Sequence, residues 1–158
     1  MSLLQKEAVE RKALIPNIVK YKLAFKLKKG PQFEGVASIA FELASKSAIF
    51  LELEAQLVEF IEINAKPIEK GQISTFWNKA ASSLRIPADF LLPGQNALRI
   101  YYISTYFPSN TFGPISIVGQ SQYIFTKDEP FWGHRLFPCF DQPDIKGKFE
   151  AAIFTPID

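Results

Sequence analysis

Apolar and polar residues alternate along much of this chain, and a period of two predicts β-strands. Residues 17–28 give the clearest case. The apolar positions there are Val19, Tyr21, Leu23, Phe25 and Leu27, and the lysines between and after them are Lys20, Lys22, Lys26 and Lys28. We expect a half-buried antiparallel strand whose lysine face lies in water, in preference to a site for a polyanion.

The same reasoning predicts further strands along the chain. They cover residues 33–43, 48–54, 73–77, 82–86, 98–103, 122–126 and 148–154. Residues 57–64 are more continuously apolar, which predicts a strand covered on both faces. Residues 104–120 contain prolines, glycines and several Ser or Thr residues, so we expect a long irregular connection there. The pattern predicts one all-β domain of about eight to ten strands, as a sandwich or an open twisted sheet.

Composition and charge restrict the class of protein. Apolar residues make up 47% of the 158 positions and aromatic residues 14%, as in a folded globular domain. A net charge of +2 gives no electrostatic footprint for nucleic acid or an anionic membrane. No apolar stretch approaches the roughly 20 residues that span a bilayer.

The expected location is intracellular and soluble. The first sixteen residues lack a long apolar core and carry Glu7 and Glu10, which argues against a secretory signal. The single cysteine, Cys139, excludes an internal disulfide and agrees with a reducing compartment. The cytoplasm is therefore favoured, and an organelle stays open.

The most specific feature is the run of residues 123–149, which reads YIFTKDEPFWGHRLFPCFDQPDIKGKF. It resembles the signature at the end of the amino-terminal β-domain of M1-family zinc aminopeptidases (aminopeptidase N-like). In that family a Y-x-[YF]-T strand leads to an acidic residue and Pro, then to Arg and F-P-C-F-D-[EQ]-P-x-x-K. The matching residues are Tyr123, Phe125, Thr126, Glu129, Pro130, Arg135, Phe137, Pro138, Cys139, Phe140, Asp141, Gln142, Pro143 and Lys146.

The resemblance covers residues 17–158 and leaves residues 1–16 as an amino-terminal extension. Within that extension, residues 2–14 are the chain's only helical candidate, although their apolar positions fit a helical stripe poorly. The family's fold is a saddle-like, mainly antiparallel twisted sheet with a smaller sheet packed on it. The family's domain also runs past residue 158, so the resemblance implies a version truncated at the C-terminal end, with an unpaired sheet edge and an open apolar face for a partner.

The motif residues also have a physical interpretation of their own. Residues 137–140 combine aromatic bulk, a fixed φ and a small thiol, which suits a tight apolar corner. Asp141 and Asp144 can accept backbone N–H bonds in a turn, and we expect Arg135 to pair with one of them. The expected structural set is Arg135, Phe137, Pro138, Cys139, Phe140, Asp141, Pro143 and Lys146.

The neighbouring titratable residues do not predict chemistry. Cys139 is expected to be an inert core thiol, since only His134 could act as a base and no triad is visible. His134, Cys139 and Asp141 are crowded into eight residues, which does not follow the spacing of a zinc site, so we expect no metal in this chain.

Glu129 is the one residue for which the resemblance implies a functional role. In M1 aminopeptidases the matching acidic residue reaches from the β-domain into the active site and helps hold the free α-amine of the substrate. The alternative is an ordinary solvated loop glutamate beside Lys127 and Asp128.

The catalytic parts of an M1 peptidase are missing from this sequence. Such an enzyme needs H-E-x-x-H and a downstream Glu to hold zinc, and a G-x-M-E-N loop for the substrate. The chain has one histidine, and its one methionine is Met1. By itself it is therefore not predicted to be an enzyme, and the zinc cofactor of the family belongs to the catalytic domain.

Three functions follow from these observations. The first is a non-catalytic, M1-derived β-domain that serves as a structural or binding subunit of a larger assembly. The second is a fragment or split chain that contributes Glu129 to a zinc aminopeptidase whose catalytic domain lies on another chain. The third is a small-molecule or carbohydrate module with an aromatic platform of Trp77, Tyr101, Tyr102 and Trp132.

Overall fold

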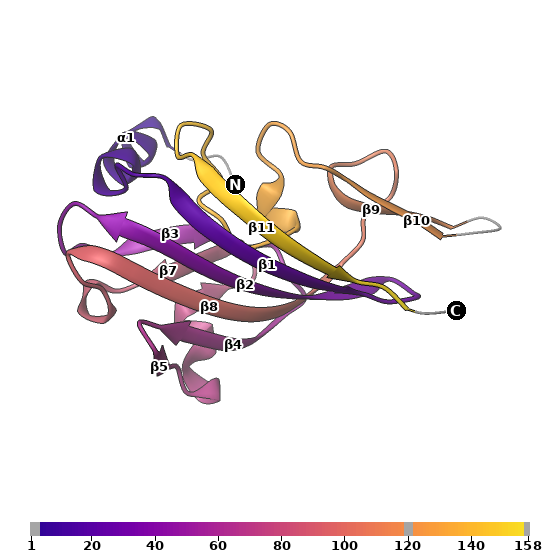
Figure 1. Cartoon of the computed structure of the whole chain (residues 1–158), viewed down its shortest axis with the longest axis horizontal. Coiled ribbons are helices and arrows are strands. Elements are labelled where there is room, and N and C mark those ends of the chain that lie inside the picture. Colours follow the sequence, from indigo (N-terminus) through magenta and orange to yellow (C-terminus); the bar gives the residue numbers. More distant parts are fainter. Residues whose placement is uncertain (1–3, 119–121, 157–158) are drawn as a thin grey trace.

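The computed structural model describes residues 4–118 and 122–156 and confirms a mainly antiparallel all-β fold (Figure 1). The strands are β1 (Val19–Leu27), β2 (Gln32–Leu43), β3 (Ile49–Glu52), β4 (Leu57–Ile63), β5 (Lys66–Pro67), β6 (Trp77–Asn78), β7 (Ser83–Ile86), β8 (Gly94–Thr105), β9 (Gly113–Val118), β10 (Gln122–Lys127) and β11 (Gly147–Phe154). The helices are α1 (Gln5–Leu14) and α2 (Ile73–Phe76), with 3₁₀ turns η1 (Lys70–Gln72), η2 (Ala88–Phe90) and η3 (Gly133–Arg135).

The largest sheet has six strands in the order β11-β1-β2-β8-β4-β5. All its pairs are antiparallel except β1 with β11, which is parallel. Burial along β1 alternates as the sequence predicts, with Val19, Tyr21 and Leu23 inside and Lys20 and Lys22 outside. Because side chains of one parity all point to the same face, this alternation fixes which face of the sheet meets the core.

A smaller sheet packs on that inner face, as expected, with strand order β3-β7-β6. Leu51 of β3 and Leu84 of β7 are fully buried in the same apolar cluster as the inner residues of the large sheet. The indole N–H of Trp77 in β6 donates to the carbonyl of Leu53 at 3.1 Å. The two sheets therefore share one core.

Three of the expected elements are wrong in detail. Residues 73–77 form helix α2 followed by β6. One helical turn places Ile73 and Phe76 on the same face, where both are buried, whereas a strand would point them to opposite faces. Residues 104–120 are not irregular throughout, since β9 lies within them and pairs with β10. β4 is not covered on both faces: a β-bulge between Val58 and Phe60 shifts the alternation, so an apolar-looking run keeps one buried face.

Helix α1 forms although its apolar stripe is weak, because a polar residue attaches it to the core. Arg11 is the one buried residue of the helix, and only 2% of it is exposed. Its Nη1 lies 2.8 Å from Oε1 of Glu52, and its Nε donates to Oε1 of Gln142 at 3.0 Å. Gln142 in turn donates to the carbonyl of Ala8 at 2.8 Å.

The two edges of the large sheet differ. One edge is β5, which is two residues long and contains Pro67, features that discourage pairing with another chain. The other is β11, eight residues long and mostly exposed, and among the described residues it pairs only with β1. Beyond it the β9–β10 hairpin extends away from the body of the domain (Figure 1). None of the helices formed by the described residues is long and apolar enough to cross a membrane.

Candidate functional site

The segment between β10 and β11 forms a corner that is hydrogen-bonded to the end of β3. The N–H of Glu52 donates to the carbonyl of Cys139 at 2.9 Å, and the N–H of Cys139 donates back to Glu52 at 3.1 Å. The N–H of Glu54 donates to the carbonyl of His134 at 2.9 Å. These bonds hold the backbone of the motif rigidly against the smaller sheet.

The apolar part of the motif lies inside. Pro138, Cys139 and Phe140 are buried, and Phe137 is half-buried against Tyr21, with ring centroids 5.6 Å apart. Pro143 and Lys146 are exposed, and the carbonyl of Lys146 accepts the N–H of Val19 at 2.9 Å where β1 and β11 begin to pair.

Arg135 does not pair with Asp141 or Asp144, contrary to expectation. Its Nε donates to Oε2 of Glu54 at 3.0 Å, and its Nη1 donates to the carbonyl of Phe112 at 2.9 Å. The guanidinium lies 4.1 Å from the ring centroid of Trp132 and 4.4 Å from that of Phe107. Glu54 takes this role because its backbone N–H is bonded to the carbonyl of His134 in η3, which brings its side chain beside Arg135. The two residues are far apart in the sequence, so their pairing could not be predicted from proximity.

Asp141 pairs with His134. Its Oδ2 lies 2.6 Å from Nδ1 of His134 and accepts the backbone N–H of the same residue at 3.2 Å. The backbone N–H of Asp141 donates to Oε2 of Glu52 at 3.0 Å. These hydrogen bonds hold residues 134 and 141 together, so the pair has a structural role in this turn.

Cys139 sits in the core, and burial together with the nearby carboxylate of Asp141 raises the pKa of its thiol well above the ordinary value. A thiol held in the protonated form is a poor nucleophile and a poor metal ligand. Among residues 4–118 and 122–156, no three His, Cys, Asp or Glu side chains are grouped so that they could hold a metal ion.

Glu129 lies on the exposed loop that follows β10 and is joined to Pro130 by a cis peptide bond. In the described part of the chain its carboxylate makes no hydrogen bond or ion pair. The N–H of Trp132 donates to the carbonyl of Asp128 at 2.8 Å, which closes a turn around it. Glu129 is thus an accessible carboxylate in a hydrogen-bonded turn.

The proposed aromatic platform does not exist. Trp77 and Tyr102 are buried in the core, and Tyr102 donates its hydroxyl to the carbonyl of Leu136 at 2.6 Å. Trp132 stacks on Phe112, with 5.7 Å between ring centroids, and its ring also contacts the guanidinium of Arg135. These side chains build the fold and leave no common surface for a sugar ring.

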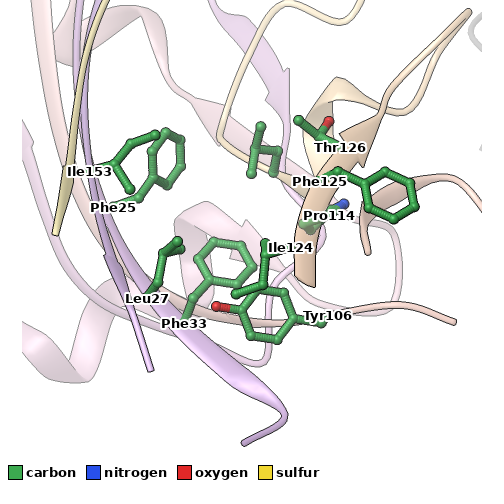
Figure 2. A pocket seen from close by; sticks show the side chains of 10 residues that line it. Phe25, Leu27, Phe33, Tyr106, Pro114, Ile124, Phe125, Thr126 and Ile153 are labelled. Carbon is green, nitrogen blue, oxygen red and sulfur yellow. The ribbon is translucent and has the colours of Figure 1, made fainter. Parts of the chain in front are cut away.

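An apolar groove of about 160 Å³ opens between the large sheet and the β9–β10 hairpin (Figure 2). Phe25, Phe33 and Ile153 line one side, and Ile124 of β10 faces them across the opening, whereas the ring of Phe125 points away from it. The exposed fraction is 63% for Ile153 and 45% for Phe125. These are large apolar side chains left in water.

Sequence reasoning missed this groove, although the sequence carries a signal for it. Residues 123–125 and residues 151–154 are apolar at consecutive positions, a pattern typical of strands covered on both faces. In this structure both strands are mostly exposed. The mismatch between an apolar sequence and an exposed strand marks a surface suited to contact with other polypeptide.

The structure is a β-domain of two packed sheets and the β9–β10 hairpin, with the motif corner hydrogen-bonded to its smaller sheet. The profile of the family "Peptidase M1 N-terminal domain" matches residues 17–158, and the chain belongs to this family.

Individual relatives agree with that assignment. The chain is 24% identical to aminopeptidase N of Streptomyces lividans over 97% of its own length and 18% of the relative's. It is 26% identical to putative aminopeptidase-2 of Caenorhabditis elegans over 80% of its length and 8% of that protein's. The chain therefore spans less than a fifth of these curated relatives.

Solved structures show the same fold. An M1 zinc metallopeptidase of Deinococcus radiodurans superposes with a TM-score of 0.68 at 18% identity, covering 90% of this chain and 34% of that one. Native yeast LTA4 hydrolase gives 0.67 at 18% identity, covering 89% of this chain and 23% of the other.

Proposed function

We propose that this chain acts as a non-catalytic M1-type β-domain, a structural and binding subunit of a larger intracellular assembly. The observation that carries the proposal is the exposed apolar groove beside the open β11 edge. Large apolar side chains in water cost free energy, and a contiguous group of them marks a contact surface.

The arrangement of charge supports a polypeptide partner. The exposed residues Phe149 and Ile153 occupy the inner face of β11, whereas the lysines of β1 occupy the opposite face of the sheet, together with Phe154. A partner that enters the groove would cover apolar surface without burying those lysines, which avoids the cost of desolvating charge.

A pair of matched variants tests this proposal. Ile153→Asp places a carboxylate in the groove, and Leu92→Asp places one on an exposed apolar side chain outside it. We expect the wild type and Leu92→Asp to co-purify stoichiometrically with the same partner chains under native conditions, and Ile153→Asp to lose them. Equal recovery of partners with both variants would contradict docking through the groove.

A second candidate function rests on Glu129. In this proposal the chain is part of a split aminopeptidase, and Glu129 binds the substrate's α-amine beside a catalytic domain carried on another chain. The accessible carboxylate in a hydrogen-bonded turn favours it, because an exposed carboxylate can accept a charge-assisted hydrogen bond from an ammonium group.

Kinetics of a reconstituted pair would test the second candidate. If a chain bearing H-E-x-x-H co-purifies, Glu129→Gln should lower kcat/KM for peptides with a free α-amine by about tenfold to a hundredfold, as loss of a charged hydrogen bond predicts. Glu69→Gln, at an exposed position near η1, is the matched control. Unchanged kcat/KM in Glu129→Gln would remove this function.

A further inference from the structure

We infer that helix α1 and the motif corner between β10 and β11 are coupled through the side chain of Glu52, so that docking of α1 positions the turn that carries Glu129. Two segments that are far apart in the sequence meet at this carboxylate, and each supplies a hydrogen-bond donor to it. The coupling joins a helix that precedes residues 17–158, the part matched by the family profile, to a motif inside them. It concerns contacts within the chain, so its test is independent of both proposed functions.

Glu52 accepts hydrogen bonds from both segments. Its two carboxylate oxygens lie 2.8 and 2.9 Å from Nη1 of Arg11, and Oε2 also accepts the backbone N–H of Asp141 at 3.0 Å. A carboxylate that is bonded to a guanidinium is held in one orientation, and here that orientation serves Asp141 as well. Because the side chain of Glu52 is 19% exposed, loss of Arg11 would let its carboxylate turn toward water and would weaken the bond to Asp141.

Gln142 forms a second connection between the same two segments. Its Oε1 accepts the Nε–H of Arg11 at 3.0 Å, and its Nε2 donates to the carbonyl of Ala8 at 2.8 Å. The residue is buried, and both polar groups of its side chain bond to α1. If α1 leaves, a buried amide loses its partners, and movement of residue 142 toward water relieves that cost.

From Asp141 the contacts continue to the turn of Glu129. The carboxylate of Asp141 holds both the backbone N–H and the ring of His134. The ring of His134 lies 5.9 Å from that of Trp132, measured between centroids. The backbone N–H of Trp132 donates to the carbonyl of Asp128 and so closes the turn around Glu129. A displacement of residue 141 is therefore transmitted to this turn through adjoining contacts.

The contacts of helix α1 suit it to dock and to leave. It has ten residues, fewer than the roughly 12–15 that an isolated helix needs in water, so its helical form depends on docking. Within residues 5–14, Arg11 is the one buried residue, and docking of the helix therefore depends on polar bonds. Ile15, directly after the helix, is fully buried. The helix can leave Glu52 while its C-terminal end stays attached at Ile15.

Residue-resolved hydrogen exchange of the full chain tests the coupling. Val9→Pro places a proline inside α1 at an exposed position and disfavours the helix by about a hundredfold. Val9→Ala changes the same side chain but favours the helix, so it is the matched control. The amides of Asp141, His134 and Trp132 report on the corner, and the amide of Ile100 in the central strand β8 reports on global unfolding.

We expect Val9→Pro to speed exchange at Asp141 by about tenfold or more relative to Ile100, as loss of a hydrogen bond to a charged group predicts. His134 and Trp132 should change in the same direction, and Val9→Ala should match the wild type. Faster exchange confined to the amides of α1 would overturn the inference. Equal acceleration at Ile100 would also overturn it, because α1 would then contribute only to global stability. A response that stops before Trp132 would remove the positioning of Glu129.

Arg11→Lys gives a second measurement that keeps the helix, since lysine and arginine have similar helix propensities. The lysine leaves a positive charge beside Glu52 but cannot bond Glu52 and Gln142 at once through a planar fork. We expect faster exchange at Asp141 than in the wild type, with a smaller change at Ile100. Exchange at Asp141 that equals the wild type would overturn the role of Arg11 in the coupling.

Discussion

The guanidinium of Arg11 and the carboxylate of Glu52 form a partly buried ion pair, with Nη1 2.8 Å from one carboxylate oxygen and 2.9 Å from the other. Arg11 precedes the residues that the family profile matches, whereas Glu52 ends β3 beside the motif corner. The amino-terminal helix is therefore integrated into the domain through a polar contact.

Removing Arg11 should destabilise the domain. In Arg11→Ala, Glu52 and the side chain of Gln142 lose their shared partner in a largely buried site, and we expect the free energy of unfolding to fall by about 3 kcal/mol. Urea unfolding followed by circular dichroism measures this. The control is Lys6→Ala on the same helix, whose exposed pair with Glu10 should change stability by less than about 0.5 kcal/mol. Equal effects of the two variants would show that the contact of Arg11 with Glu52 and Gln142 does not stabilise the domain.

Gly35→Ala should be severely destabilising. A Cβ at this position of β2 would overlap the ring of Tyr102 on the neighbouring strand, and Tyr102 is fully buried with its hydroxyl bonded to Leu136. We expect a loss of about 3 kcal/mol or more, or failure to fold. Gly71→Ala is the matched control, because a Cβ there meets nothing within 4 Å. Similar melting temperatures for the two variants would show that the ring can move aside.

Arg135→Lys should weaken the motif corner despite keeping its charge. A lysine cannot bond Glu54 and the carbonyl of Phe112 through a planar fork, and it loses the guanidinium's stacking on Trp132. We expect a loss of about 1.5–3 kcal/mol in the free energy of unfolding, measured by urea titration. Arg85→Lys, at an exposed arginine over Phe50, should cost much less. If Arg135→Lys is as stable as the wild type, the fork geometry is unimportant.

Asp128→Asn should stabilise the protein at neutral pH. Partial burial, with a smaller contribution from Asp141, raises the pKa of the Asp128 carboxyl in the folded state, while a hydrogen bond from Thr126 opposes the shift. A carboxyl whose pKa is higher in the folded state than in the unfolded state favours folding when it is neutral. Its contribution to the stability of the wild type is therefore lost as the pH rises from the pKa of the unfolded state through that of the folded state.

The asparagine variant removes that dependence. Its advantage over the wild type should be largest near pH 7 and should shrink as pH falls below the folded pKa, which denaturant titrations of both proteins from about pH 3 to pH 7 would reveal. Comparing the two at each pH cancels the titration of the other carboxylates. An advantage that does not change with pH would indicate a cause other than ionisation.

The sequence was a good guide wherever one strong pattern acted locally. The alternation in β1 predicted its inner and outer faces because a half-buried strand has no other way to sort Val19 from Lys20. The motif of residues 123–149 pointed to the family through many fixed residue types at fixed spacing.

Prediction failed where distant segments decide the outcome. The partner of Arg135 is Glu54, which lies 81 positions away and reaches the corner only because β3 packs there. The groove is lined by residues of β1, β10 and β11. From the sequence, the apolar residues of β10 are expected in the core, and only the fold shows that they are mostly exposed. The role of Glu129 stays a prediction, since it concerns a substrate and a second domain.

Hydrogen exchange of the native assembly tests the central claim most directly. The amides of Phe149, Ala151 and Ile153, which point away from β1, would be compared between the protein isolated from its own cells in its assembly and the same chain purified and diluted, with β8 amides as an internal reference. We predict strong protection of the three amides in the assembly and rapid exchange in the diluted chain. Rapid exchange in both states would show that the β11 edge and its groove stay uncovered, and would contradict a binding role for this domain.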